Sequence, residues 1–174
     1  MYDVIYADPP WKFSSRGARG GMYGELDYPT MTLAEMKAMR VQDVAADNCA
    51  LFMWSTSAHV FEAHEVAKAW GFKYVRIDKI WHKNRPVVGP WGMSDMEPLL
   101  LFVKGKMCSE QAVRNQKQVY SADRDGKHSE KPSLFRTLIE ERFPEARKLE
   151  MFARQTSDGW DVFGNEVDSS IRID

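Results

Sequence analysis

The feature that most constrains the fold is an alternation of short apolar runs with segments of helical periodicity. The apolar runs, which predict strands, cover residues 2–7, 50–54, 72–83, 98–103, 148–152 and 160–163. The helical segments begin with a capping box at residues 32–35 and continue with residues 57–70 and 132–143. Strands that alternate with helices predict an α/β protein, in which helices pack on the faces of a sheet.

Two of the segments between these elements lack periodicity and are predicted to be loops. Residues 8–31 contain four glycines, and residues 84–96 contain two glycines and two prolines. The chain has 174 residues, 44% of them apolar, which suits a single domain over residues 1–174. No apolar run approaches the roughly 20 residues of a membrane span, and no secretory signal is visible, so we expect a cytoplasmic protein with no membrane partner. The two cysteines have no metal-type spacing, so we also expect no metal.

The most unusual motif is Asp8-Pro9-Pro10-Trp11, which directly follows the first apolar run. Proline cannot continue a sheet ladder and holds the residue before it extended, so the strand must stop with Asp8 at its carboxyl end. One interpretation is a strand end with a capping acid and a buried aromatic ring. The other is a functional site, because ligands of α/β sheets bind outside the carboxyl ends of the strands.

Charge and missing motifs restrict the kind of ligand. The net charge of −1 does not indicate a nucleic-acid partner, but residues 12–19 contain three bases and no acid, and residues 76–85 contain four bases and one acid. Such cationic loops fit a phosphate backbone, and they fit ordinary solvated loops equally well. The chain has no Gly-x-Gly-x-x-Gly, P-loop or Gly-x-Ser-x-Gly motif, so dinucleotide binding, nucleotide hydrolysis and serine hydrolysis lack their usual motifs.

Taken together, the segments resemble the MT-A70 family of adenine N6-methyltransferases over nearly the whole chain. ADPPW (7–11) is similar to the catalytic motif of that family. The other similar segments, in order, are YPTMTLAEM (28–36), LFMW (51–54), WGFKYVRIDKIWHKN (70–84), EPLLLFVKG (97–105), HSEKP (128–132), KLEMFAR (148–154) and GWDVFGNE (159–166). The resemblance implies a Rossmann-like class I S-adenosylmethionine-dependent methyltransferase fold of permuted motif order, in which the catalytic motif precedes the cofactor motif.

The resemblance also implies roles for single residues. In the bound S-adenosyl-L-methionine, Lys131 would pair with the carboxylate of the cofactor, and Asp8 would face its ammonium group. The residues implied on the ribose and adenosine side are Glu150, Arg154, Asn165 and Glu166. Tyr28 contacts the target adenine. The pocket for the cofactor's adenine is specified least, because longer relatives contact that ring with a segment before the first strand, where this sequence begins.

The chemistry explains why such a site needs an acid and a proline. The N6 lone pair of adenine is delocalised into the ring, and two acceptors aimed at the N6 protons turn it toward the methyl group. We assign these acceptors to the Asp8 carboxylate and to a backbone carbonyl, that of Pro9, whose direction is fixed by the ring of proline. Trp11 offers the extruded base a stacking surface. The cationic side chains expected to bind backbone phosphates are Lys12, Arg16 and Lys83.

The sequence therefore favours methylation of adenine N6 in DNA. The same reaction on RNA is an alternative, and a catalytically silent nucleic-acid-binding subunit is another. The intact Asp8-Pro9-Pro10-Trp11 motif argues against the silent subunit. The chain has no room for a separate target-recognition domain, so we expect it to act alone with relaxed specificity, as a homodimer, or with a second subunit.

Overall fold

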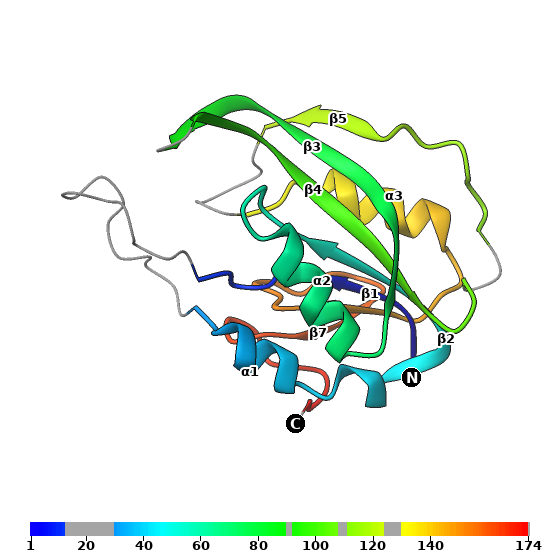
Figure 1. Ribbon diagram of the computed structural model, residues 1–174. Helices are drawn as coiled ribbons and strands as arrows, with labels where there is room; N and C mark the ends of the chain where they lie inside the picture. The colour runs from blue at the N-terminus through cyan, green and yellow to red at the C-terminus, as the bar shows by residue number, and fades with distance from the viewer. Residues whose placement is uncertain (13–29, 90–91, 108–110, 124–129, 174) are drawn as a thin grey trace.

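The computed structural model describes residues 1–12, 30–89, 92–107, 111–123 and 130–173, and their centre is a seven-stranded sheet. The strands are β1 (Tyr2–Ala7), β2 (Ala45–Trp54), β3 (Lys73–Gly89), β4 (Gly92–Lys104), β5 (Val119–Ala122), β6 (Lys148–Met151) and β7 (Trp160–Phe163). The sheet order is β5-β3-β4-β2-β1-β6-β7. The helices are α1 (Leu33–Ala38), α2 (Val60–Ala69) and α3 (Leu134–Arg142), with a short 3-10 helix at Val41–Asp43. Helices α1 and α2 lie on one side of the sheet and α3 lies on the other (Figure 1).

The position of β1 in the sheet determines where the site lies. β1 runs parallel to both of its neighbours, β2 and β6, and β7 is parallel to β6. The register places Ala7, the last residue of β1, beside Met53 and Met151. Because the carboxyl ends of these parallel strands meet at one edge, the residues that follow them are brought together there.

Both faces of β1 are buried, which explains its continuous apolar sequence. Ile5 belongs to the cluster under α1 and α2, whereas Val4 and Tyr6 belong to the cluster under α3. On the α3 side, Phe135 packs edge-on against Trp54 with ring centroids 4.8 Å apart. Full burial of such a side chain contributes about 1.5–3 kcal/mol. The helices α1, α2 and α3 are therefore held on the sheet mainly by their apolar faces.

The expected order of strands and helices is confirmed, and so is the capping box. The Thr32 side chain accepts from the Glu35 backbone N–H, and the Glu35 carboxylate accepts from the Thr32 backbone N–H at 2.7 Å. Several boundaries differ from the expectation. β2 begins five residues before the expected residue 50, α2 begins at Val60 rather than at residue 57, and β5 was not expected.

The predicted loop over residues 84–96 is wrong, because β3 and β4 form a long antiparallel hairpin through most of that range. Prolines and glycines there indicated a break. Pro86 is tolerated because β5 pairs with β3 only over Ile80–Lys83 and the register with β4 shifts between His82 and Val87, so this proline needs no ladder donor. The predicted loop 8–31 lies mostly outside the described residues. No helix in the described part of the chain is long and apolar enough to span a membrane.

Candidate active site

Asp8 lies at the carboxyl edge of the sheet because β1 ends there. Its backbone N–H donates to the Met151 carbonyl at 3.4 Å, the last contact of β1 with β6 before Pro9 ends the ladder. The edge is hollowed by a cavity of about 440 Å³. A cavity of this size is within the range of small-molecule sites, roughly 300–1,000 Å³.

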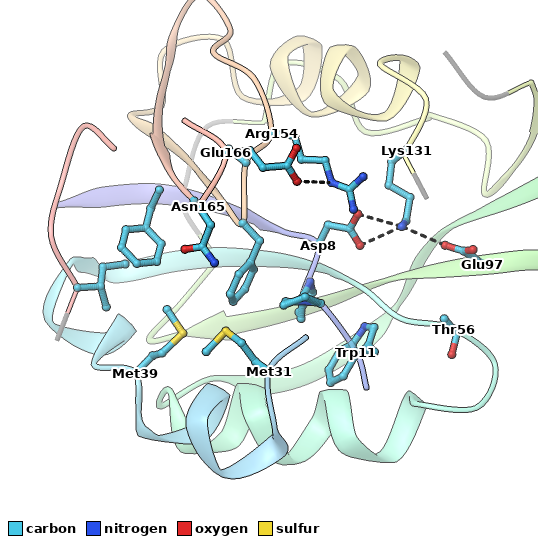
Figure 2. Close-up of a pocket in the computed structure, with 17 residues that line it drawn as sticks. Asp8, Trp11, Met31, Met39, Thr56, Glu97, Lys131, Arg154, Asn165 and Glu166 are labelled. Carbon is cyan, nitrogen blue, oxygen red and sulfur yellow. Dashed lines mark hydrogen bonds and ion pairs between the residues drawn. The ribbon is translucent and has the colours of Figure 1, made fainter. Parts of the chain in front are cut away.

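The cavity walls come from several segments that are far apart in the chain (Figure 2). Eight of the expected site residues line it: Asp8, Pro9, Pro10, Trp11, Lys131, Arg154, Asn165 and Glu166. The sequence did not single out the others, which are Met31, Met39, Thr56, Glu97, Phe152, Ala153, Phe163, Gly164 and Ile173. The structure therefore brings together residues that lie more than 120 positions apart.

Two carboxylates hold Lys131 at one end of the cavity. Its ammonium lies 2.9 Å from an oxygen of Asp8 and 3.2 Å from an oxygen of Glu97. Glu97 also pairs with Lys83 at 2.5 Å. The side chains of Lys131 and Glu97 are only 10% and 13% exposed, whereas Asp8 is 26% exposed and faces the cavity. This cluster is a preorganised set of charges in a partly desolvated site.

Burial and charge act in different directions on these groups. Burial raises the pKa of the Asp8 carboxyl, which Lys131 opposes. Burial would also raise the pKa of Glu97, but the ammonium groups of Lys131 and Lys83 together hold it below its usual value. Burial would lower the pKa of Lys131, yet its two carboxylate partners raise it. Of the two acids, Asp8 is therefore the more readily protonated.

Trp11 is fixed by three contacts. Its backbone N–H donates to the Pro9 carbonyl at 2.8 Å, and its indole N–H donates to the Trp54 carbonyl at 3.2 Å. The imidazole of His59 stacks on its ring, with centroids 5.5 Å apart and planes inclined by 13°. His59 Nδ1 is in turn 2.7 Å from the hydroxyl of Thr56. Trp11 is thus a rigid part of the cavity wall. Its backbone N–H already occupies one of the two lone pairs of the Pro9 carbonyl oxygen.

Glu150 is directed away from the main cavity. Arg136 binds it through two hydrogen bonds, of 3.0 Å and 2.9 Å, in a bidentate pair. The pair lines a neighbouring hollow of about 40 Å³, whose walls also include Asp8, Lys131 and Arg154. Glu150 therefore reaches a ligand only beside the main cavity, and Arg136 is a partner that the sequence did not indicate.

Close approach of two chain segments places Asn165 and Glu166 at the cavity. The backbone N–H of Ala153 donates to the Phe163 carbonyl at 3.0 Å. A Cβ atom on Gly164 would lie 2.2 Å from the Ala153 carbonyl oxygen, so only glycine fits. Arg154 and Glu166 then lie 3.6 Å apart across the cavity mouth.

The expected nucleic-acid contacts are only partly described. Lys12 is exposed, and Arg16 and Tyr28 lie outside the described residues. Lys83 is buried, at 9% exposure, and its ammonium points to Glu97 rather than to solvent. In the sequence Glu97 is an acid directly before an apolar run, and it reaches this edge because β4 runs antiparallel to β2. In the described ranges, no group of three or more His, Cys, Asp or Glu side chains could hold a metal ion.

Parallel strands with a cavity at their carboxyl edge place this protein among the α/β proteins that bind their ligand at this edge of the sheet. The MT-A70 family model matches residues 2–166, and the chain belongs to this family. Members of the family are methyltransferases that use S-adenosyl-L-methionine as the methyl donor.

Relatives with known names cover the whole chain. It is 34% identical over 189 aligned positions to the type II methyltransferase M.MunI of Mycoplasma sp, with 99% of this chain and 81% of that protein aligned. It is 29% identical to the N(6)-adenosine-methyltransferase MT-A70-like protein of Arabidopsis thaliana and 28% identical to the N(6)-adenosine-methyltransferase catalytic subunit METTL3 of Homo sapiens. Of these two proteins the chain spans only 24% and 29% of the length.

Proposed function

We propose that this protein transfers the methyl group of S-adenosyl-L-methionine to the N6 amino group of adenine in DNA. The observation that carries the proposal is the Asp8 carboxylate, which faces a cavity at the carboxyl edge of the sheet and is held there by Lys131. DNA is favoured because the relative with 34% identity, most of whose length is aligned, is a type II methyltransferase. We place the enzyme in the cytoplasm and treat residues 1–174 as one domain, which the continuous seven-stranded sheet supports.

The cavity fits the cofactor by its chemistry. S-adenosyl-L-methionine supplies an electrophilic methyl group on a sulfonium, and it has a charged amino-acid end and an adenosine end. Lys131 provides a cation for the carboxylate, and Asp8 an anion for the ammonium. Arg154, Asn165 and Glu166 would hold the adenosine side, and Glu150 the ribose through the neighbouring hollow.

Asp8 and Pro9 act on the amino group of the base. The Asp8 carboxylate accepts a hydrogen bond from one N6–H, and the free lone pair of the Pro9 carbonyl oxygen accepts a hydrogen bond from the other. Both acceptors stabilise the positive charge that develops on N6 as the carbon–nitrogen bond forms. The N6 proton becomes acidic only at that stage, and its loss to Asp8 or to water leaves neutral N6-methyladenine.

Aromatic and cationic groups would hold the base and its strand. Trp11, with Tyr28, offers a stacking surface, and stacking of this kind contributes about 1–3 kcal/mol per base. Flipping an adenine out of a duplex costs a few kcal/mol. Phosphate contacts from Lys12 and Arg16 would offset that cost. The buried Lys83 acts differently, by holding Glu97 against Lys131.

We also propose the permuted motif order of a class I methyltransferase. The chain reaches the Asp8 motif on β1 first and the segment of Glu150 and Arg154 on β6 much later, yet the two strands are neighbours in the sheet. A homodimer or a second subunit stays a prediction of the sequence, which sedimentation velocity of the purified chain would test.

Methyl transfer from labelled cofactor tests the proposed function. The purified protein is incubated with matched DNA and RNA of the same sequence, which are then digested to nucleosides. We expect labelled N6-methyladenine from DNA. Label in RNA alone would identify RNA, and not DNA, as the substrate. Binding of both nucleic acids without labelling of either would identify a catalytically silent subunit.

A further inference from the structure

The cavity has two chemically different ends. Lys131, Glu97 and Thr56 lie on one side of Asp8, and Met31 and Met39 lie on the other (Figure 2). The side chains of Phe152, Phe163 and Ile173 also line the cavity. Lys131 and Glu97 therefore lie on the opposite side of Asp8 from the two methionines, and a second ion pair, Arg154 with Glu166, lies away from the Lys131 end (Figure 2).

Ile173 reaches the cavity because the segment after β7 folds back on the sheet. The Ser170 backbone N–H donates to the Val162 carbonyl at 2.8 Å, and its hydroxyl accepts from the Val162 N–H at 3.1 Å. The Ser169 hydroxyl accepts from the Gly164 N–H at 3.1 Å. Beyond these anchors, Ile171 and Ile173 both pack against the apolar cluster under α1 and α2. Only Ile173 of the two lines the cavity.

We propose that Ile173, together with Met39 and Phe163, forms the subsite for the adenine ring of the cofactor. The inference rests on the proposed function, and it assigns a cofactor contact to the segment that follows the last strand. The methyl group must lie near Asp8 to meet N6. With the amino-acid part beside Lys131, the adenosine must extend from Asp8 toward the side of Met31 and Met39.

The apolar end suits the faces of a purine, and Asn165 suits its edge. A flat aromatic ring gains from apolar contact on its faces, and burial of that surface drives its binding. Its edge needs a donor and an acceptor, and an amide side chain has both. Asn165 lines the same cavity and points in Figure 2 toward the side of Met39. The competing occupant of this end is the target adenine of the nucleic acid.

The test compares two variants of the same segment. Ile173→Ala removes a cavity contact, and Ile171→Ala is the matched control, which removes a packing contact outside the cavity. Titration calorimetry with S-adenosylhomocysteine, adenosine and methionine measures the affinity of each part. We expect Ile173→Ala to weaken the binding of S-adenosylhomocysteine and of adenosine about tenfold, which is about 1.4 kcal/mol. The affinity for methionine should not change. Ile173→Leu restores the apolar contact and should bind within about twofold of the wild type.

Four results would overturn the inference. Equal affinities of Ile173→Ala and the wild type for adenosine would remove Ile173 from the subsite. An unchanged affinity for S-adenosylhomocysteine with a raised KM for DNA would assign the apolar end to the target base. A wild type that binds none of the three probes would refute cofactor binding itself, and the subsite with it. Equal losses in Ile171→Ala and Ile173→Ala would show a packing effect and no specific contact.

Discussion

Replacement of Asp8 is the most informative perturbation, because the structure separates its chemical role from its structural one. Removal of a preorganised group that stabilises transition-state charge costs about 10²–10³ in kcat. The side chain of Asp8 is 26% exposed, so solvent weakens its effect and we expect the lower limit. Asp8→Ala should therefore lower kcat about 100-fold, or about 2.7 kcal/mol at about 1.36 kcal/mol for each factor of ten.

The same variant should barely change stability. Burial raises the pKa of Asp8, so its charged form gains little from folding. Lys131 loses one partner but keeps Glu97 at 3.2 Å. We expect the free energy of unfolding to change by less than about 1 kcal/mol, which in a chain of this size is a shift in Tm of about 2–4 °C.

Asp8→Asn separates the acceptor from the charge. The amide oxygen still accepts from N6, so we expect a smaller loss, of about tenfold. Because the raised pKa of Asp8 makes protonation easier, kcat of the wild type should fall on the acid side as Asp8 takes up a proton. The acid limb should be missing in Asp8→Asn.

The assay is transfer of label from S-adenosyl-L-methionine to DNA at saturating cofactor, with Tm measured by circular dichroism. Asp161→Asn is the control, since Asp161 accepts from Tyr2 at the far end of β1 and should retain full activity. Turnover of Asp8→Ala within about fivefold of the wild type would refute the assigned role. A fall in Tm of more than about 8 °C would show that the carboxylate is structural.

Three further predictions follow from the contacts around the site. Glu97→Gln removes one of the two anions beside Lys131, so we expect the raised pKa of Lys131 to fall and the affinity for the cofactor to drop at least threefold while kcat stays nearly constant. Calorimetry and initial rates measure the two quantities, and equal losses of affinity and kcat would contradict this prediction. His59→Ala removes the ring stacked on Trp11 and should raise the KM for DNA several-fold, whereas His59→Phe keeps a stacked ring and should have the KM of the wild type. An unchanged KM in both variants would show that His59 does not position Trp11. Burial raises the pKa of Tyr2 to about 12 from 10.0, so its contribution to stability is present below pH 10 and lost between about pH 10 and 12; urea unfolding at pH 8 and 11 should show this loss in the wild type and not in Tyr2→Phe.

Local chemistry made much of the fold predictable. The capping box at Thr32 and Glu35 fixes the start of α1 within four residues, and the structure shows both of its hydrogen bonds. The end of β1 was equally clear, since Pro9 has no N–H to continue the ladder. Where the sequence misled, the cause was context: Pro86 and its neighbouring glycines suggested a loop, but a strand tolerates proline where no donor is needed.

The sequence by itself determined the class of the protein and about half of the residues around its cavity, because a motif such as Asp8-Pro9-Pro10-Trp11 carries its chemistry within a few positions. Only the tertiary structure decided how those residues are paired. Glu97 pairs with Lys131, Arg136 pairs with Glu150, and Ile173 lines the cavity. Such pairings depend on strand order and register, which bring distant segments to one edge of the sheet and leave no periodic signal in the chain.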